Sequence, residues 1–219
     1  CWEPWTQMLR ELERLDRPLA FAGVGCGPLP PNVEASGAHR EIATVRERAG
    51  IVTVVASGKY ARMRAGIHQA NFQILRMEPQ ARILVGVQVA PEQHPEGGAA
   101  VAGGASQTAD GWGWSPLGAL HHKGGHMLLP RGQSATDSTW GQGDRLSLRL
   151  DVDQGVLTGI KNDGEWKGVI CRLEMPLHPE RHSHWRELCW NVEMLRADTS
   201  VRVEWGACAR KPSDSAATD

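Results

Sequence analysis

The chain has 219 residues, which suits one large all-β domain or two small ones and lets folding bury roughly 70% of the unfolded surface. Lys and Arg total 24 against 25 Asp and Glu, so the net charge of −1 excludes the positive field on which general nucleic-acid binding depends. Five cysteines, odd in number and without a CxxC pair, exclude a disulfide framework and a Cys-based zinc site.

No apolar run approaches the roughly 18 to 20 residues of a membrane span, so we expect no membrane association. With the cysteine pattern, this predicts an intracellular protein, cytoplasmic or nuclear. The chain begins at Cys1 instead of a methionine, so we expect a part of a larger polypeptide or complex.

The N-terminal segment is predicted to contain a helix followed by a linker. Apolar residues recur at helical spacing over residues 4–17 until Pro18 ends the pattern, which predicts one short amphipathic helix. Residues 20–36 are rich in Gly and Pro and predict a linker or wrapping loop. We therefore assign residues 1–41 to an N-terminal helix and wrapping segment.

Three short runs that are dense in β-branched residues follow, at 51–56, 67–75 and 83–89. In the last two runs, large apolar residues recur at every second position, as they do in strands with one buried side. Residues 91–110 are mostly small and polar, and they predict a mobile surface loop.

The central part of the chain reads as a three-stranded meander. Leucines alternate with polar residues over 146–152, and a turn with Gly155 in the left-handed position leads into a strand at 156–160. A second turn at 162–165 leads into a strand at 166–173. Strict alternation places Val169, Cys171 and Leu173 of that strand on one face.

Strand patterns resume at 188–192 and 201–205, and the tail at 209–219 is polar and predicted to be disordered. Many short strands with turns between them and a single helix predict an all-β fold, an antiparallel β-sandwich with one short N-terminal helix. We assign residues 42–208 to this sandwich.

Three blocks of sequence resemble the SPRY family, the sandwich modules of SOCS-box adaptors, tripartite-motif ligases, Ran-binding scaffold proteins and ryanodine receptors. The blocks lie at 66–74 with 82–87 (GIH and ILVGV), 110–114 with 120–124 (DGWGW and LHHKG), and 143–157 with 162–169 (GDR, LDVDQGVL, NDG and KGV). Their order and spacing are similar to those of the family, and the pattern looks nearest to the SOCS-box type.

The resemblance implies a concanavalin-like sandwich that binds its partner through loops at one end. In the SOCS-box type the pocket uses the loop before the VGV strand, the loop before the WGW block and the turn ahead of the last strand. Placed on this chain, the partner-binding residues are Tyr60, Arg62, Arg64, Glu78, Gln80, Val101, Leu195 and Arg196.

Two groups of histidines are candidate metal ligands. His121 and His122 are adjacent on a strand, so they point to opposite faces and cannot share one ion with His126 without a bend. Residues 178–184 hold three more histidines without a Cys or carboxylate at zinc-finger spacing. We expect no metal and no other cofactor.

The remaining motifs favour structural roles. Asp151 and Asp153 resemble the start of a calcium loop, but strands flank them, and they more plausibly serve a β-turn. The glycines of 23–27 are too close together for a dinucleotide fingerprint, and no G-x-S-x-G elbow is present. Cys171 and Cys189 fall within apolar strand patterns, as buried inert thiols do. We therefore expect no enzymatic activity.

Nine tryptophans stand against one tyrosine and two phenylalanines. Trp112 and Trp114 share strand parity and are predicted to face the core. Trp140 and Trp185 lie in polar, loop-like contexts, so we expect them to contribute loop contacts to a partner, although a loop Trp can also pin its own loop.

The leading hypothesis is a non-catalytic interaction module that recognises a peptide or protein surface through loops at one end of the sandwich. The SPRY resemblance implies a substrate adaptor of a ubiquitin ligase or a scaffold protein. An alternative is a structural subunit docked permanently in a large intracellular assembly. A sugar-binding sandwich, in which exposed tryptophans stack on sugars, ranks below both.

Overall fold

The computed structural model describes residues 19–23, 28–46, 51–57, 62–78, 81–90, 106, 111–129, 137–173 and 187–205. The helix expected over 4–17, the tail at 209–219 and most of the loop at 91–110 lie outside these residues. Within them, the named elements are β-strands and the 3-10 turn η3 (Asn162–Gly164). No helix in these ranges is long and apolar enough to cross a membrane.

The strands form two sheets of seven, counted over the described ranges. Sheet A has the order β1-β4-β13-β6-β7-β8-β9, and sheet B has the order β12-β11-β10-β5-β14-β3-β2. The strands are β1 (Ala20–Gly23), β2 (Val33–Ser36), β3 (Ile42–Val45), β4 (Val52–Ser57), β5 (Ile67–Arg76), β6 (Ile83–Val89), β7 (Gly111–Trp114), β8 (Ala119–His122), β9 (Gly125–Leu128), β10 (Arg145–Asp151), β11 (Val156–Lys161), β12 (Trp166–Arg172), β13 (Leu188–Met194) and β14 (Ser200–Trp205).

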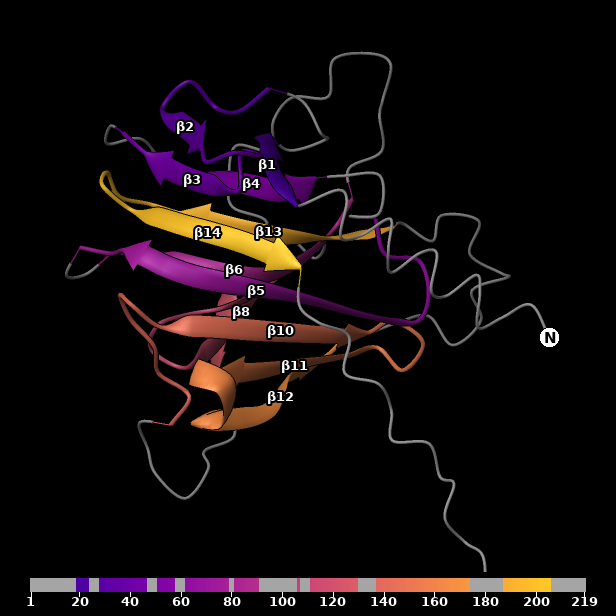
Figure 1. The fold of residues 1–219 in the computed structure, drawn as a ribbon. Helices are drawn as coiled ribbons and strands as arrows, with labels where there is room; N and C mark the ends of the chain where they lie inside the picture. The colour runs from indigo at the N-terminus through magenta and orange to yellow at the C-terminus, as the bar shows by residue number, and fades with distance from the viewer. Residues whose placement is uncertain are drawn as a thin grey trace, which may run out of the picture.

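All pairings within the two sheets are antiparallel. Figure 1 shows the sheets as two stacked layers, with sheet B toward the viewer. The antiparallel β-sandwich expected from the strand pattern is therefore confirmed. The accompanying N-terminal helix stays a prediction, because it falls outside the described residues.

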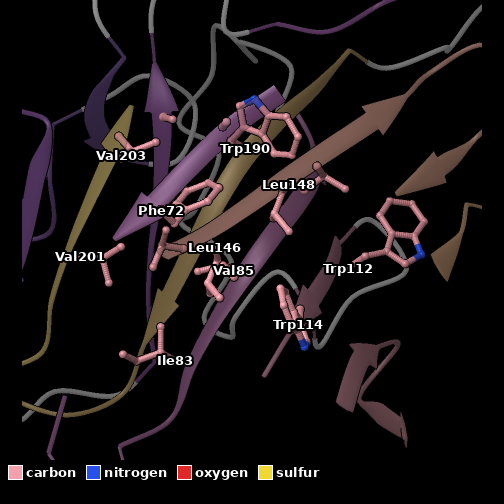
Figure 2. Packing of buried hydrophobic residues seen from close by; sticks show 14 of the residues in the cluster. Phe72, Ile83, Val85, Trp112, Trp114, Leu146, Leu148, Trp190, Val201 and Val203 are labelled. Atoms are coloured by element: carbon pink, nitrogen blue, oxygen red, sulfur yellow. The ribbon is translucent and has the colours of Figure 1, made fainter. Parts of the chain in front are cut away.

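The core lies between the sheets and takes alternate side chains from each. Leu146, Leu148 and Leu150 of β10 are fully buried, as their alternation predicts. Phe72 of β5 and Trp190 of β13 meet edge to face with ring centroids 6.3 Å apart, and Figure 2 shows them side by side in this space. Since these residues come from different sheets, their contact ties the two layers together.

A second aromatic group fills the core beneath β7. Trp114 is fully buried, and its ring lies 5.0 Å from the ring of Trp166 and 6.2 Å from that of Trp140. The Trp114 indole N–H donates a hydrogen bond to the Ser138 carbonyl at 3.1 Å, so its polar atom is satisfied in the core. Trp112 is also buried, and the predicted core orientation of both residues is confirmed.

Two local predictions differ from the structure. Residues 20–23 and 33–36, expected in a wrapping loop, form strands β1 and β2, which pair with β4 and β3. Val169, expected on the same face as Cys171 and Leu173, is 44% exposed while those two are buried, because a bulge opposite Leu157 and Thr158 shifts the register of β12. The sandwich therefore contains strands that precede residue 42.

Candidate functional site

One end of sheet A brings together three of the residues that the resemblance selects. The Leu195 N–H donates to the Arg82 carbonyl at 3.0 Å, which continues the β13–β6 pairing by one step. The Ala81 N–H donates to the Glu78 carbonyl at 2.9 Å. We call this region, formed by Glu78, Ala81, Arg82, Leu195 and Arg196, the Leu195 end. Glu78 is exposed there, and Leu195 and Arg196 are half-buried.

Arg62 and Arg64 lie at the opposite end of β13, beside Glu187. The Arg62 guanidinium pairs with the Glu187 carboxylate at 2.8 Å, and Arg64 pairs with the other carboxylate oxygen. Met63, between them, exchanges backbone hydrogen bonds of 2.7 and 3.0 Å with Leu188. These contacts fix the segment against the start of β13.

The two ends are separated by the length of β13. Leu188 pairs with Val89 at one end, and Met194 pairs with Ile83 at the other. At about 3.3 Å per residue, these two pairs lie roughly 20 Å apart. The structure therefore does not bring Arg62 and Arg64 together with Glu78, Leu195 and Arg196 in one small pocket.

The other predicted contact residues divide between the core and the undescribed part of the chain. Tyr60, Gln80, Val101 and Trp185 lie outside the described residues. Trp140 is 5% exposed, and its ring packs edge-on against the ring of Trp114. The expectation that Trp140 offers a partner contact is therefore corrected: this indole fills the core, and pinning its own loop is the better account.

The outer face of sheet A, next to the Leu195 end, carries a row of basic side chains that the sequence did not reveal. Gly113 of β7 pairs with His121 of β8, which pairs with His126 of β9. The His121 and His126 rings stack with centroids 5.7 Å apart. A guanidinium nitrogen of Arg82 lies 3.5 Å from Nδ1 of His121. We call Arg82, His121 and His126 the basic row.

The neighbouring His122 faces the other way, as predicted. Its ring stacks on Trp112 with centroids 4.7 Å apart and an interplanar angle of 8°. Its Nδ1–H donates to the Gly111 carbonyl at 2.8 Å. The adjacent histidines therefore serve opposite faces of β8, and His122 cannot join a ligand set with His121.

A buried carboxylate lies on the same outer face of sheet A. Glu193 of β13 is 2% exposed and accepts two hydrogen bonds from Ser106, from its N–H at 2.5 Å and its hydroxyl at 2.9 Å. Burial raises the pKa of Glu193, while the Ser106 hydrogen bonds and the charge of Arg82 oppose this. Each carboxylate oxygen thus accepts one hydrogen bond from Ser106.

Comparison with known proteins shows which fold this architecture resembles. No protein-family model matches the chain, and no curated protein matches it. Among solved structures, the SPRY domain of human HERC1 superimposes with a TM-score of 0.55 at 19% identity, covering 79% of this chain and 92% of that one. The chain has the SPRY fold.

The β10–β11 turn of this SPRY sandwich has the structural role expected for its acidic residues. Asp151 accepts a hydrogen bond from the Gln154 N–H at 2.9 Å, and Asp153 accepts one from the Gly66 N–H at 3.0 Å. Gly155 takes the predicted left-handed conformation, with φ of 62°. Over the described ranges, no group of three or more His, Cys, Asp or Glu side chains is arranged to hold a metal ion.

Proposed function

We propose that this chain is a non-catalytic interaction module that recognises a peptide or protein surface at the Leu195 end of its SPRY sandwich. The observation that carries the proposal is the convergence of Glu78, Leu195 and Arg196 at that end, in connections next to the paired strands β13 and β6. Accessible groups held next to a rigid sheet suit recognition, because little ordering entropy is lost on binding.

A protein partner fits the charge of the chain better than a nucleic acid. The net charge is −1, and the Leu195 end presents both an acidic and a basic side chain. Cys171 is a free thiol, which supports a reducing intracellular compartment, cytoplasmic or nuclear. Within this proposal the module serves as the substrate adaptor of a ubiquitin ligase or as part of a scaffold protein.

Affinity purification from native lysate, followed by mass spectrometry, tests the proposal. The bait is the intact chain, compared with a triple variant Glu78→Ala, Leu195→Ala, Arg196→Ala. The matched control is the double variant Arg62→Ala, Arg64→Ala, which changes the opposite end of β13. Loss of a few partners with the triple variant alone supports recognition at the Leu195 end.

The same experiment separates the competing hypotheses. Partners lost with the control and kept with the triple variant would move the site to the Glu187 end. A whole complex kept by all three baits would favour a structural subunit that docks through another face.

A further inference from the structure

The basic row on sheet A carries the positive charge of Arg82, which forms no ion pair with a carboxylate in the part of the chain that the structure describes. Over the described ranges, no carboxylate lies within ion-pair distance of Arg82, and its closest polar side-chain contact is the 3.5 Å approach to His121. A guanidinium offers five N–H donors, so one long contact leaves most of them available to a ligand. His121 is half-buried beside it, and His126 is exposed.

The sheet register assembles the row from three strands. Arg82 precedes β6 and His121 lies on β8, so their contact must cross the intervening strand β7. At the crossing point β7 has Gly113, where a β-carbon would lie 2.8 Å from the Leu84 β-carbon. The missing side chain at Gly113 leaves room for Leu84 on this face, and the Arg82 side chain reaches His121 beside it.

The electrostatics of the row favour an anionic ligand. Burial lowers the pKa of His121, and the positive charges of Arg82 and His126 lower it further. Glu193 attracts Arg82 through space, and its two oxygens accept hydrogen bonds from Ser106 without an ion pair to Arg82. Lys123, the other charged residue of this hairpin, is exposed in the β8–β9 turn. A ligand carboxylate would be attracted by Arg82 and would offset the lowering of the His121 pKa that Arg82 causes.

We propose that the basic row binds a glutamate or aspartate side chain of an extended acidic segment in the protein partner. Carboxylates match the fork of a guanidinium, and the imidazoles supply further donors when protonated. This assignment rests on the proposed function, because the Arg82 carbonyl is bonded to Leu195 and the row therefore begins at the proposed binding end.

The position of β9 at the edge of sheet A favours a ligand segment in extended conformation. β9 is the last strand of sheet A in the described fold, and His126 and Met127 are exposed on it, Met127 at 66%. An extended chain can pair with such an edge while alternate side chains reach the two faces. An acidic residue then meets His126 on the outer face, and an apolar neighbour meets Met127 on the other.

Binding of a carboxylate must be coupled to proton uptake by the histidines. A bound anion raises the pKa of His121, so affinity increases as the pH falls from 7.5 to 6.0, where glutamate is still ionised. A probe without a carboxylate should show no such dependence.

The test uses the intact chain and a capped pentapeptide with two glutamates at alternate positions, beside a twin with two glutamines. Imidazole carbon-proton NMR signals are followed at pH 6.0 and 7.5. The glutamate peptide is expected to shift the His121 and His126 signals, and its affinity is expected to be severalfold higher at pH 6.0 than at pH 7.5. The glutamine twin is expected to cause no shift. Arg82→Gln should weaken the glutamate peptide roughly tenfold, the scale of one charge-assisted hydrogen bond. Arg172→Gln changes an exposed side chain on β12 of the other sheet and should have no effect.

Several outcomes would overturn the assignment: equal shifts from both peptides, no shift at His121, or equal effects of Arg82→Gln and Arg172→Gln. Tighter binding of a phosphoserine twin by tenfold or more would replace the carboxylate with a phosphate. If Arg82→Gln does not fold, two variants take its place. Arg82→Lys keeps the charge but removes the guanidinium fork, and His126→Asn changes an exposed side chain.

Lysate capture with the same variants separates this inference from the proposed function. Partners kept by Arg82→Gln but lost with the triple variant at the Leu195 end would leave the interaction module intact and reject the basic row. Partners lost with both variants would support the two proposals together. Failure of the unchanged chain to capture any partner would count against the module itself, while the peptide titration would still decide on the row.

Discussion

Gly86 of β6 lies so close to Trp112 of β7 that a β-carbon on Gly86 would sit 1.9 Å from the Trp112 carbonyl oxygen. The obstacle is backbone, which cannot rotate away as a flexible side chain can. The absence of a side chain at Gly86 is therefore a condition for pairing the VGV strand with the WGW strand.

Gly86→Ala is expected to lower the free energy of unfolding by about 3 kcal/mol or more, because it forces β6 and β7 apart. Urea unfolding followed by tryptophan fluorescence measures the change. Gly125→Ala is the matched control, since a β-carbon there meets nothing closer than the His122 carbonyl at 3.5 Å. Equal losses in the two variants would contradict the close-approach argument.

Glu193→Gln tests how the buried carboxylate that accepts hydrogen bonds from Ser106 changes the free energy of unfolding. The pKa of Glu193 is raised above its ordinary value of 4.5, so its protonated form is favoured in the folded protein. Stability from this group is present below pH 4.5 and is lost as the pH rises through the folded pKa. The stability of the unchanged chain relative to Glu193→Gln should therefore decrease between pH 4 and pH 7. A difference that is flat or rises with pH would refute this sign.

The Glu187 pair predicts the opposite pH dependence at the other end of β13. Arg62 and Arg64 lower the pKa of Glu187 through hydrogen bonds and charge, against the effect of its burial. Stability from this carboxylate is present above pH 4.5 and is lost as the pH falls through its folded pKa.

Double-mutant cycles between Glu187→Gln and each arginine variant measure this pairing. Since Arg64 is largely exposed, solvent screens its charge, and a coupling of about 0.5 to 1 kcal/mol is expected for either arginine at neutral pH. The coupling should disappear in acid. A coupling that stays constant while the pH falls through the folded pKa of Glu187 would show that packing of the side chains, instead of charge, joins these residues.

Strand alternation was enough to predict the centre of the sandwich. Leu146, Leu148 and Leu150 are buried where period-two alternation places them. The same rule fails at Val169, because a bulge adds one residue to β12 and no residue type in the sequence marks it. Strands β1 and β2 were missed because Gly and Pro dominate their surroundings and hide two four-residue pairings that depend on distant strands.

The candidate site was harder to predict, because its parts meet through sheet pairing. His121 and His126 flank Lys123 and Gly124, whose φ values of 52° and 72° suit a two-residue hairpin, so their proximity could have been inferred from the sequence. Arg82 is 39 residues from His121 and carries no local signal. Its contribution follows from the order β6-β7-β8, which the sequence did not specify.

Cys171 should be chemically inert in the folded protein, although a free thiol is a nucleophile in an unfolded chain. Burial raises its pKa to about 12, so on the order of one molecule in ten thousand carries the thiolate at pH 8. Iodoacetamide at pH 8, followed by peptide mass spectrometry, should leave Cys171 unmodified in buffer and label it fully in urea. Labelling in buffer at the rate of a free cysteine would show that β12 opens at the edge of sheet B. Because Cys171 pairs with Leu157 beside the bulge, such opening would locate the weakest strand pairing of the sandwich at that register shift.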